Sequence, residues 1–165
     1  MLQSIWSNFI SQWSWYLGLV GQHLAISFSA IAIACIIGGV AGVLITRYQR
    51  AAKPTLGVVN FLYTIPTISM LGFLIPFSGA GDLTAVIALC VYALLPVVRG
   101  VHTGLSNIDP AIIEAAVGMG STDSQIMRRI RVPLAMPVIM SSVRNMATMT
   151  IALTGMASFV GSGGL

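Results

Sequence analysis

The stretch 109–137, DPAIIEAAVGMGSTDSQIMRRIRVPLAMP, is the long polar interruption in an otherwise apolar chain. Asp109 suits the N-cap of a helix, and Pro110 suits its first helical position. Gly118 and Gly120 are predicted to end this helix, since glycine readily takes left-handed backbone angles. The stretch therefore begins with a short helix that leads into a glycine hinge.

A second short helix is predicted after the hinge. Thr122 and Gln125 have the spacing of a capping box, in which each residue bonds the backbone of the other. Three arginines gather toward the end of this helix, where the helix dipole favours cations. Pro133 is expected to end it, because the residue before a proline disfavours helical angles. Residues 109–132 are thus predicted to form a helical hairpin.

The hairpin resembles the signature of ABC-importer permeases, which is Glu-Ala-Ala, three residues, Gly, nine residues, Ile, one residue and Leu-Pro. The chain departs from this pattern only at Val132, which replaces the leucine. The resemblance implies a cytoplasmic hairpin that docks into a groove on an ATPase subunit. The residues that it places at this coupling site are Glu114, Ala115, Ala116, Gly120, Ile130 and Pro133.

Two other interpretations of the hairpin stay open. One is an ordinary surface hairpin with no partner. The other is a DNA-reading helix-turn-helix, since two helices, a glycine turn and arginines fit its outline. The apolar segments on both sides disfavour the second interpretation, because they leave no room for a third helix.

The composition indicates a membrane protein. Of 165 residues, 56% are hydrophobic and only 7% are charged, whereas soluble domains carry about 25% charged residues. The net charge of +4 is therefore interpreted as a topology signal, and no nucleic-acid partner is expected. Cys35 and Cys90 lie in apolar runs without the spacing of a disulfide framework or a metal site.

Four apolar segments are long enough to cross about 30 Å of hydrocarbon. They predict an all-α polytopic bundle, a single domain over 1–165, with spans at about 23–46, 55–77, 83–105 and 133–157. The aromatic segment 1–22 is predicted to be a short interfacial helix or a simple lead-in to the first span. In the permease family one more membrane helix follows a glycine-rich segment like 161–164, so a fifth span is expected to be missing.

Two spans carry features beyond length. In the first span, small residues recur every fourth position and predict close approach of another helix: Ala30, Ala34, Gly38 and Gly42. In the second span, Pro66 predicts a kinked helix. The polar residues around this proline are expected either to line a pore or to hydrogen-bond neighbouring helices: Tyr63, Thr64 and Thr67.

Arg144 is the charged residue inside the fourth span. A charge at this depth is costly, so the span is expected to insert with help from its neighbours. Arg144 is predicted to face the bundle interior or a wet cavity, with backbone carbonyls or water as partners. We therefore expect Arg144 to have a gating or helix-positioning role. The candidate pore or gate residues are thus Arg144 and, in the second span, Tyr63, Thr64, Pro66 and Thr67.

The positive-inside rule orients the chain. Seven of the eight basic residues flank one side of the membrane and make it cytoplasmic: Arg47, Arg50, Lys53, Arg99, Arg128, Arg129 and Arg131. The N-terminus and the 78–82 turn are then outside, and the hairpin is inside. The family resemblance implies the bacterial inner membrane.

The segments 63–67, 75–77 and 94–99 resemble permeases for quaternary amines. This resemblance implies a permease subunit for a compatible solute such as glycine betaine, choline or carnitine. It also implies three partners, namely a cytoplasmic ATPase dimer, a second permease copy or homologue, and an extracytoplasmic binding protein. Methionine or another small polar metabolite is an alternative substrate, and a channel or scaffold without an energy source is an alternative function.

An enzyme is not expected. His23 and His102 stand alone, and the sequence has no nucleophile motif, no metal-binding histidine pair and no phosphate-binding glycine loop. Because the P-loop is absent, ATP must be bound by a partner subunit and no cofactor is expected in this chain.

Overall fold

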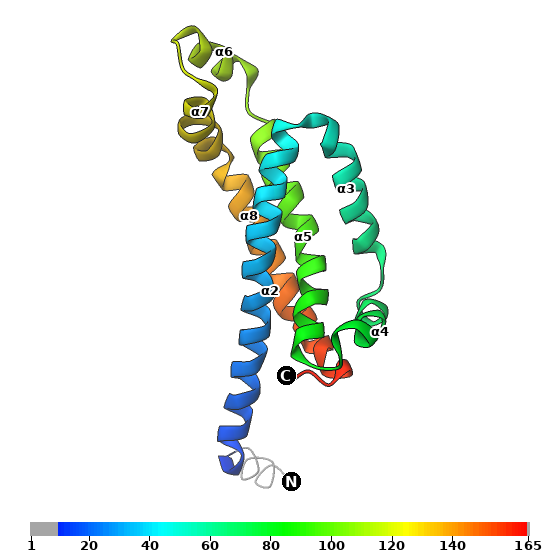
Figure 1. Cartoon of the computed structure of the whole chain (residues 1–165). Coiled ribbons are helices and arrows are strands. Elements are labelled where there is room, and N and C mark those ends of the chain that lie inside the picture. Colours follow the sequence, from blue (N-terminus) through cyan, green and yellow to red (C-terminus); the bar gives the residue numbers. More distant parts are fainter. Residues whose placement is uncertain (1–9, 165) are drawn as a thin grey trace.

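The computed structural model describes residues 10–164, and these residues form helices and connecting turns with no strand (Figure 1). The α-helices are α2 (Trp13–Arg47), α3 (Gln49–Thr64), α4 (Thr67–Ser78), α5 (Asp82–Ser106), α6 (Pro110–Gly118), α7 (Asp123–Ile126) and α8 (Val132–Thr154). A π-helical turn, η1 (Met127–Arg131), precedes α8, and a 3₁₀ turn, η2 (Gly155–Val160), follows it.

Helix α2 is continuous through the boundary predicted at residue 22, so no separate interfacial helix is present within residues 13–22. Residues 13–22 contain no proline, so every residue there can donate its backbone N–H to the helix. They form the first turns of the long helix and lead into the first span. Residues 1–9 of the predicted interfacial segment lie outside the described residues.

Helix α5 is the centre of the bundle, with α2 and α8 packed along it (Figure 1). The small-residue stripe of α2 faces it, as predicted, and Ala30, Ala34, Gly38 and Gly42 are all buried. A Cβ at Gly38 would lie 3.0 Å from the Val97 side chain, and one at Gly42 would lie 2.6 Å from Val101. Glycine is therefore required at Gly42, because any side chain would push α2 and α5 apart.

The contact between α5 and α8 uses glycine in the same way. A Cβ at Gly100 would lie 2.2 Å from Ser142 Oγ, and one at Gly104 would lie 3.2 Å from the Ala135 carbonyl oxygen. Both glycines belong to α5, whereas the glycines of the α2–α5 contact belong to α2. At both contacts, therefore, the backbone of one helix lies directly against the side chains or backbone of the other.

The second predicted span is broken rather than kinked. Helices α3 and α4 are separate and meet at an angle of 98° across Ile65 and Pro66. Pro66 lacks the N–H that a continuous helix needs. The carbonyl of Ile65, which lies at the break, accepts a hydrogen bond from the Tyr92 hydroxyl of α5. This tertiary bond stabilises a sharp turn that the proline alone does not specify. Helix α3 also begins at Gln49, before the predicted start of this span at about residue 55, and Pro54 lies inside the helix.

By length and composition, α2 and α5 qualify as membrane spans among residues 10–164, and α3 with α4 qualifies as a third when the bent pair is taken as one span. Helix α8, the fourth predicted span, does not meet this criterion. Arg144 and Asn145 near its middle lower its hydropathy. Its length and its packing along α5 are nevertheless those of the other long helices.

Candidate coupling hairpin and translocation groove

The first helix of the hairpin, α6, is closed at both ends by local hydrogen bonds. The Asp109 carboxylate accepts a bond from the Ala111 N–H at 2.9 Å, which confirms the predicted N-cap. At the other end, Gly120 N–H donates to Val117 O at 2.9 Å and Ser121 N–H donates to Ala116 O at 3.0 Å. These two bonds form a Schellman motif, which ends a helix through a left-handed residue.

Gly120 is that left-handed residue, with φ of 80°. Gly118, for which the sequence predicts the same role, is instead the last regular residue of α6. The reversal of chain direction therefore depends on one glycine, because the Schellman motif needs a single left-handed residue. The two glycines form a natural pair for experiments, since only one of them requires the absence of a side chain.

The second part of the hairpin is confirmed at its start and corrected at its end. Thr122 N–H bonds Gln125 Oε1 at 2.8 Å and Gln125 N–H bonds Thr122 Oγ1 at 3.4 Å, which completes the capping box. The helix does not end before Pro133, however. The N–H of Val132 donates to Met127 O, five residues back, and this π-helical turn leads directly into α8. The wider turn accommodates the proline, so helix α7 and span α8 are mechanically continuous.

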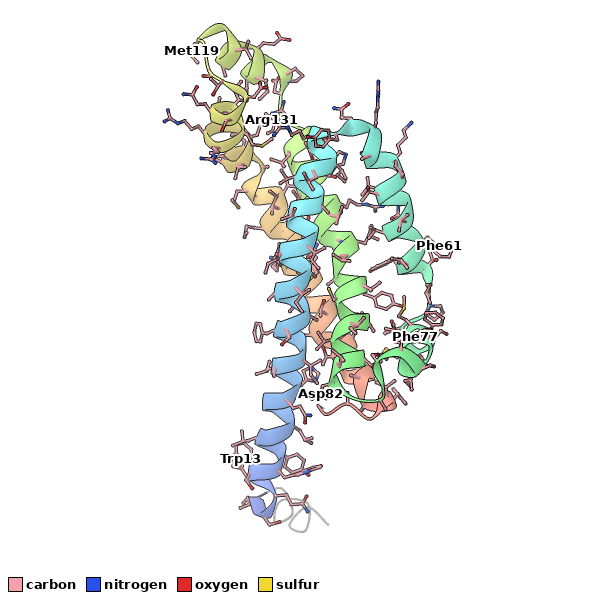
Figure 2. The ribbon with its side chains drawn as sticks, in the orientation of Figure 1. Trp13, Phe61, Phe77, Asp82, Met119 and Arg131 are labelled. Atoms are coloured by element: carbon pink, nitrogen blue, oxygen red, sulfur yellow. The ribbon has the colours of Figure 1, made fainter. Side chains whose placement is uncertain are left out.

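The signature residues lie on both sides of α6. Glu114, Ala115 and Gly120 are exposed, whereas Ala116 is buried. Met119 lies at the tip of the hairpin, farthest from the helical bundle, with 80% of its surface exposed (Figure 2). The exposed surface of α6 and the tip therefore presents the apolar side chains of Ala115 and Met119 and the carboxylate of Glu114. Ile130 is half-buried in η1, and Pro133 is exposed at the start of α8.

A groove of about 420 Å³ lies between α3, α5 and α8. Its lining is part apolar and part polar: Tyr63, Leu95, Pro96, Arg99, Gly100, Thr103, Val138, Ser142 and Asn145. One nitrogen of the Arg99 guanidinium donates to Asn60 Oδ1 at 2.8 Å, which ties the cation to α3. The groove is large enough for a small solute and is flanked by hydrogen-bonding groups.

Of the predicted pore residues, the structure brings Tyr63 to this groove. The Tyr63 hydroxyl donates to Met149 Sδ at 3.0 Å, and its ring packs edge-on against Tyr92 with centroids 6.0 Å apart. Thr64, Pro66 and Thr67 lie at the α3–α4 break and do not line the groove. The Thr64 hydroxyl donates to the Phe61 carbonyl of its own helix.

Arg144 lies outside the packed interior of this chain, so the wet cavity stays a prediction. Its side chain is exposed, and its neighbour Asn145 lines the groove instead. Successive residues on a helix point about 100° apart, so one position decides which of the two enters the groove. Within residues 10–164 the Arg144 guanidinium has no hydrogen-bonding or ion-pairing partner.

Sequence reasoning missed four polar groove residues, namely Arg99, Thr103, Ser142 and Asn145. A signal existed for two of them. Arg99 is a charge at the end of an apolar run, and Asn145 is an amide in the middle of one. Their spacing alone does not show that they share a groove, because they belong to different helices.

A polar cluster closes the opposite end of the bundle, where Asp82 begins α5 (Figure 2). Its carboxylate accepts bonds from Ser162 Oγ at 2.7 Å, Gly163 N–H at 3.1 Å and Gln22 Nε2 at 3.1 Å. A Cβ at Gly163 would lie 1.9 Å from the Gln22 side chain. The glycine-rich segment is thus seated between α2 and α5.

No group of three or more metal-ligating side chains occurs within residues 10–164. The two described cysteines, Cys35 and Cys90, are unpaired and lie in the helical interior.

The sequence is similar to known transport proteins. The family described as "Binding-protein-dependent transport system inner membrane component" matches residues 34–165. A carnitine transport permease protein of Listeria monocytogenes is 41% identical over 144 residues, covering 87% of this chain and 66% of that protein. An osmoprotectant import permease protein of Salmonella typhimurium is 42% identical over 152 residues, covering 89% of this chain and 71% of that protein.

A solved ABC transporter structure contains a chain with the same fold. The inward-facing MetNI methionine ABC transporter has a chain that is 28% identical with a TM-score of 0.80, covering 90% of this chain and 76% of that one. The chain spans about two thirds of the length of the curated relatives that it matches. The match over residues 34–165 and the identity to these permeases show that the chain belongs to the family of binding-protein-dependent transport system inner membrane components, which are permeases and not enzymes.

Proposed function

We propose that the chain is the permease subunit of an ABC importer for a compatible solute such as glycine betaine, choline or carnitine. The observation that carries this proposal is the hairpin, in which the signature at residues 114–116 lies on a capped helix that ends at Gly120. It protrudes from the end of the bundle where α2 ends and α3 begins (Figure 1). Arg47, Arg50 and Lys53 belong to this end. The identity to permeases whose names carry these solutes supports the substrate class.

The hairpin docks on a separate ATPase dimer, which binds the ATP. Glu114 and Ala115 are exposed on one helix, so an ATPase groove can hold the alanine closely and pair the carboxylate with a base. Ala116 is not available to the ATPase, because its side chain is buried and packs within this chain. Ile130 and Pro133 lie where α7 continues through η1 into α8. Motion at the hairpin therefore reaches the groove through one helical path.

The groove between α3, α5 and α8 forms one wall of the translocation path. A second permease copy or a homologous permease completes it, because the groove is open on this chain. Tyr63 and Asn145 supply its aromatic and amide surface, and Arg99 supplies its cation. The broken segment at Thr64, Pro66 and Thr67 acts as a hinge beside the path. Arg144, which is exposed on α8, meets the second permease and positions α8 for gating.

The hairpin faces the cytoplasm of the bacterial inner membrane, and the N-terminus and the Asp82 end face outward. Single cysteines at Ser78 and Ser124 test this orientation in a background that lacks Cys35 and Cys90. An impermeant thiol reagent is expected to label position 78 in intact cells and position 124 only after lysis. Labelling of position 124 in intact cells would reverse the orientation.

An extracytoplasmic binding protein delivers the solute and selects it, in related systems by enclosing a quaternary ammonium with aromatic rings. Methionine is the second candidate substrate, because the MetNI chain shares the fold at 28% identity. The test is uptake by the complex reconstituted with its ATPase and binding protein. The labelled solute is whichever of glycine betaine, carnitine or choline the complex takes up. The other unlabelled compatible solutes are expected to compete with its uptake, and unlabelled methionine is not. Competition by methionine alone would exclude the compatible-solute assignment.

A further inference from the structure

A second pocket, of about 480 Å³, lies where the hairpin meets the end of α2. Helices α2, α6 and α7 and the turn η1 all contribute to it. Three of its lining residues are arginines, Arg47, Arg128 and Arg131, and Asp123 is its one lining carboxylate. The pocket is therefore cationic overall. It is separate from the groove between α3, α5 and α8, with which it shares no lining residue.

The three guanidinium groups are available to a ligand. Within residues 10–164 none of them forms an ion pair or donates a hydrogen bond to a protein acceptor. Arg47 and Arg128 are exposed and Arg131 is half-buried. A guanidinium carries five N–H donors in a planar fork that suits the oxygens of phosphate. Three of them around one pocket make a site for a phosphate-bearing anion. Figure 2 places Arg131 at the junction of the hairpin and the bundle.

An exposed apolar stripe on α2 leads into this pocket. Ile36, Val40, Val43 and Arg47 follow one another at intervals of four, three and four residues, so they share one face of the helix. The exposed fractions of the three apolar side chains are 69%, 58% and 38%, and Val43 and Arg47 also line the pocket. Ile33, at 41% exposed, continues the stripe away from the arginines.

The length of the stripe matches one lipid leaflet. Ile33 to Val43 is ten residues, or about 15 Å along the helix, and the hydrocarbon core of a bilayer is about 30 Å thick. An acyl chain can therefore lie along α2 while its headgroup reaches the arginines. A second copy of this chain is a poor occupant for the pocket, because it presents the same cations. A free anion would leave the apolar stripe uncovered.

We infer that this stripe and pocket bind one anionic phospholipid of the cytoplasmic leaflet, with its phosphate among Arg47, Arg128 and Arg131. Basic pockets beside membrane helices on the cytoplasmic side are suited to such headgroups. The lipid then touches both α2 and the hairpin, so the site ties the hairpin to the membrane surface. This inference goes beyond the transport function and needs no partner subunit.

The test is lipid binding to the full chain, purified in mild detergent and measured by native mass spectrometry. The probes are dioleoyl phosphatidylglycerol, dioleoyl phosphatidylcholine with the same acyl chains, and glycerol 3-phosphate, which lacks acyl chains. We expect phosphatidylglycerol to bind selectively and glycerol 3-phosphate not to displace it at equal concentration. Equal binding of the two lipids would overturn the inference. Displacement by glycerol 3-phosphate would show a site for a free anion instead.

Variants locate the site. One arginine near the membrane surface contributes about fivefold to the affinity for an anionic lipid, so Arg47→Gln with Arg128→Gln is expected to weaken binding about 25-fold. Both side chains are exposed, so the pair leaves the packed interior unchanged. Arg129→Gln is the matched control, because Arg129 lies in the same turn and does not line the pocket. An equal loss in this control, or no loss in the double variant, would contradict the proposed site.

Val40→Asn tests the apolar stripe separately. Val40 is exposed and lies outside the pocket, so the substitution removes an acyl-chain contact and no cation. We expect weaker binding of phosphatidylglycerol with its preference over phosphatidylcholine retained. Unchanged affinity would show that the acyl chain does not lie on α2, and the inferred binding mode would be wrong.

Discussion

Helix α5 has two faces that use close packing for different ends. On the face toward α2, Val97 and Val101 of α5 pack directly against the α2 backbone, because the α2 residues opposite them are glycines. On the other face, Gly100 brings Ser142 equally close, yet Arg99 and Thr103 border an open groove of about 420 Å³. One helix is thus fixed along one side while it borders a solute-sized space on the other. The α2–α5 contact should therefore govern stability, and the groove should govern transport.

The largest expected effect is on the α2–α5 contact. Gly42→Ala places a Cβ 2.6 Å from the Val101 Cβ and 3.0 Å from the Val98 carbonyl oxygen, so the helices must separate. Overpacking of this kind costs about 1–3 kcal/mol. Gly39→Ala is the control, because no atom lies within 4 Å of its Cβ position, and it should stabilise α2 by about 0.5–1 kcal/mol. Thermal unfolding of the purified chain measures both. Equal stability of the two variants would mean that the α2–α5 contact is not fixed by Gly42.

The groove should show the opposite profile. Asn145→Leu removes an amide from the groove lining without filling a packed site, since Asn145 is exposed. We expect solute uptake, normalised to assembled complex, to fall about fivefold to tenfold, as for the loss of one polar contact of about 1–1.4 kcal/mol. Thr148→Val is the control, because Thr148 is exposed on the same helix outside the groove. Equal uptake by the two variants would remove Asn145 from the translocation path.

A smaller effect is expected where α5 holds the broken segment. Tyr92→Phe removes the hydroxyl that bonds the Ile65 carbonyl, and should destabilise the fold by about 1 kcal/mol. Tyr63→Phe removes only an exposed bond to Met149 Sδ and should change stability by less. Chemical denaturation compares the two. A larger loss for Tyr63→Phe would show that the bend at Pro66 does not depend on α5.

The features that were predictable from sequence are those set by neighbouring residues. The Asp109 N-cap and the capping box of Thr122 and Gln125 need only local bonds, and both form. The small-residue stripe of α2 also predicted its own burial, because four small residues at helical spacing have few other uses. The family signature could also be identified from the sequence, because it is a continuous stretch of neighbouring residues.

The features that were not predictable depend on distant parts of the chain. Pro66 indicates an interruption, but the 98° bend is accompanied by a bond from the Tyr92 hydroxyl, 27 residues after Ile65. Pro133 indicates a helix end, but a π-helical turn carries the helix past it. Whether Arg144 or Asn145 enters the groove depends on how α8 is rotated against α5, which the close approach of α8 to Gly100 sets. The groove was therefore only partly visible in the sequence.

The claim that the hairpin couples the groove to an ATPase is tested most directly by Gly120→Val against Gly118→Val. Gly120 has φ of 80°, where a side chain costs about 1 kcal/mol or more, whereas Gly118 is helical and open. The measurement is solute-stimulated ATP hydrolysis by the reconstituted complex, per assembled transporter. We predict that Gly120→Val reaches the membrane normally and loses the stimulation, and that Gly118→Val keeps it. Full stimulation in Gly120→Val would contradict the coupling role of the hairpin.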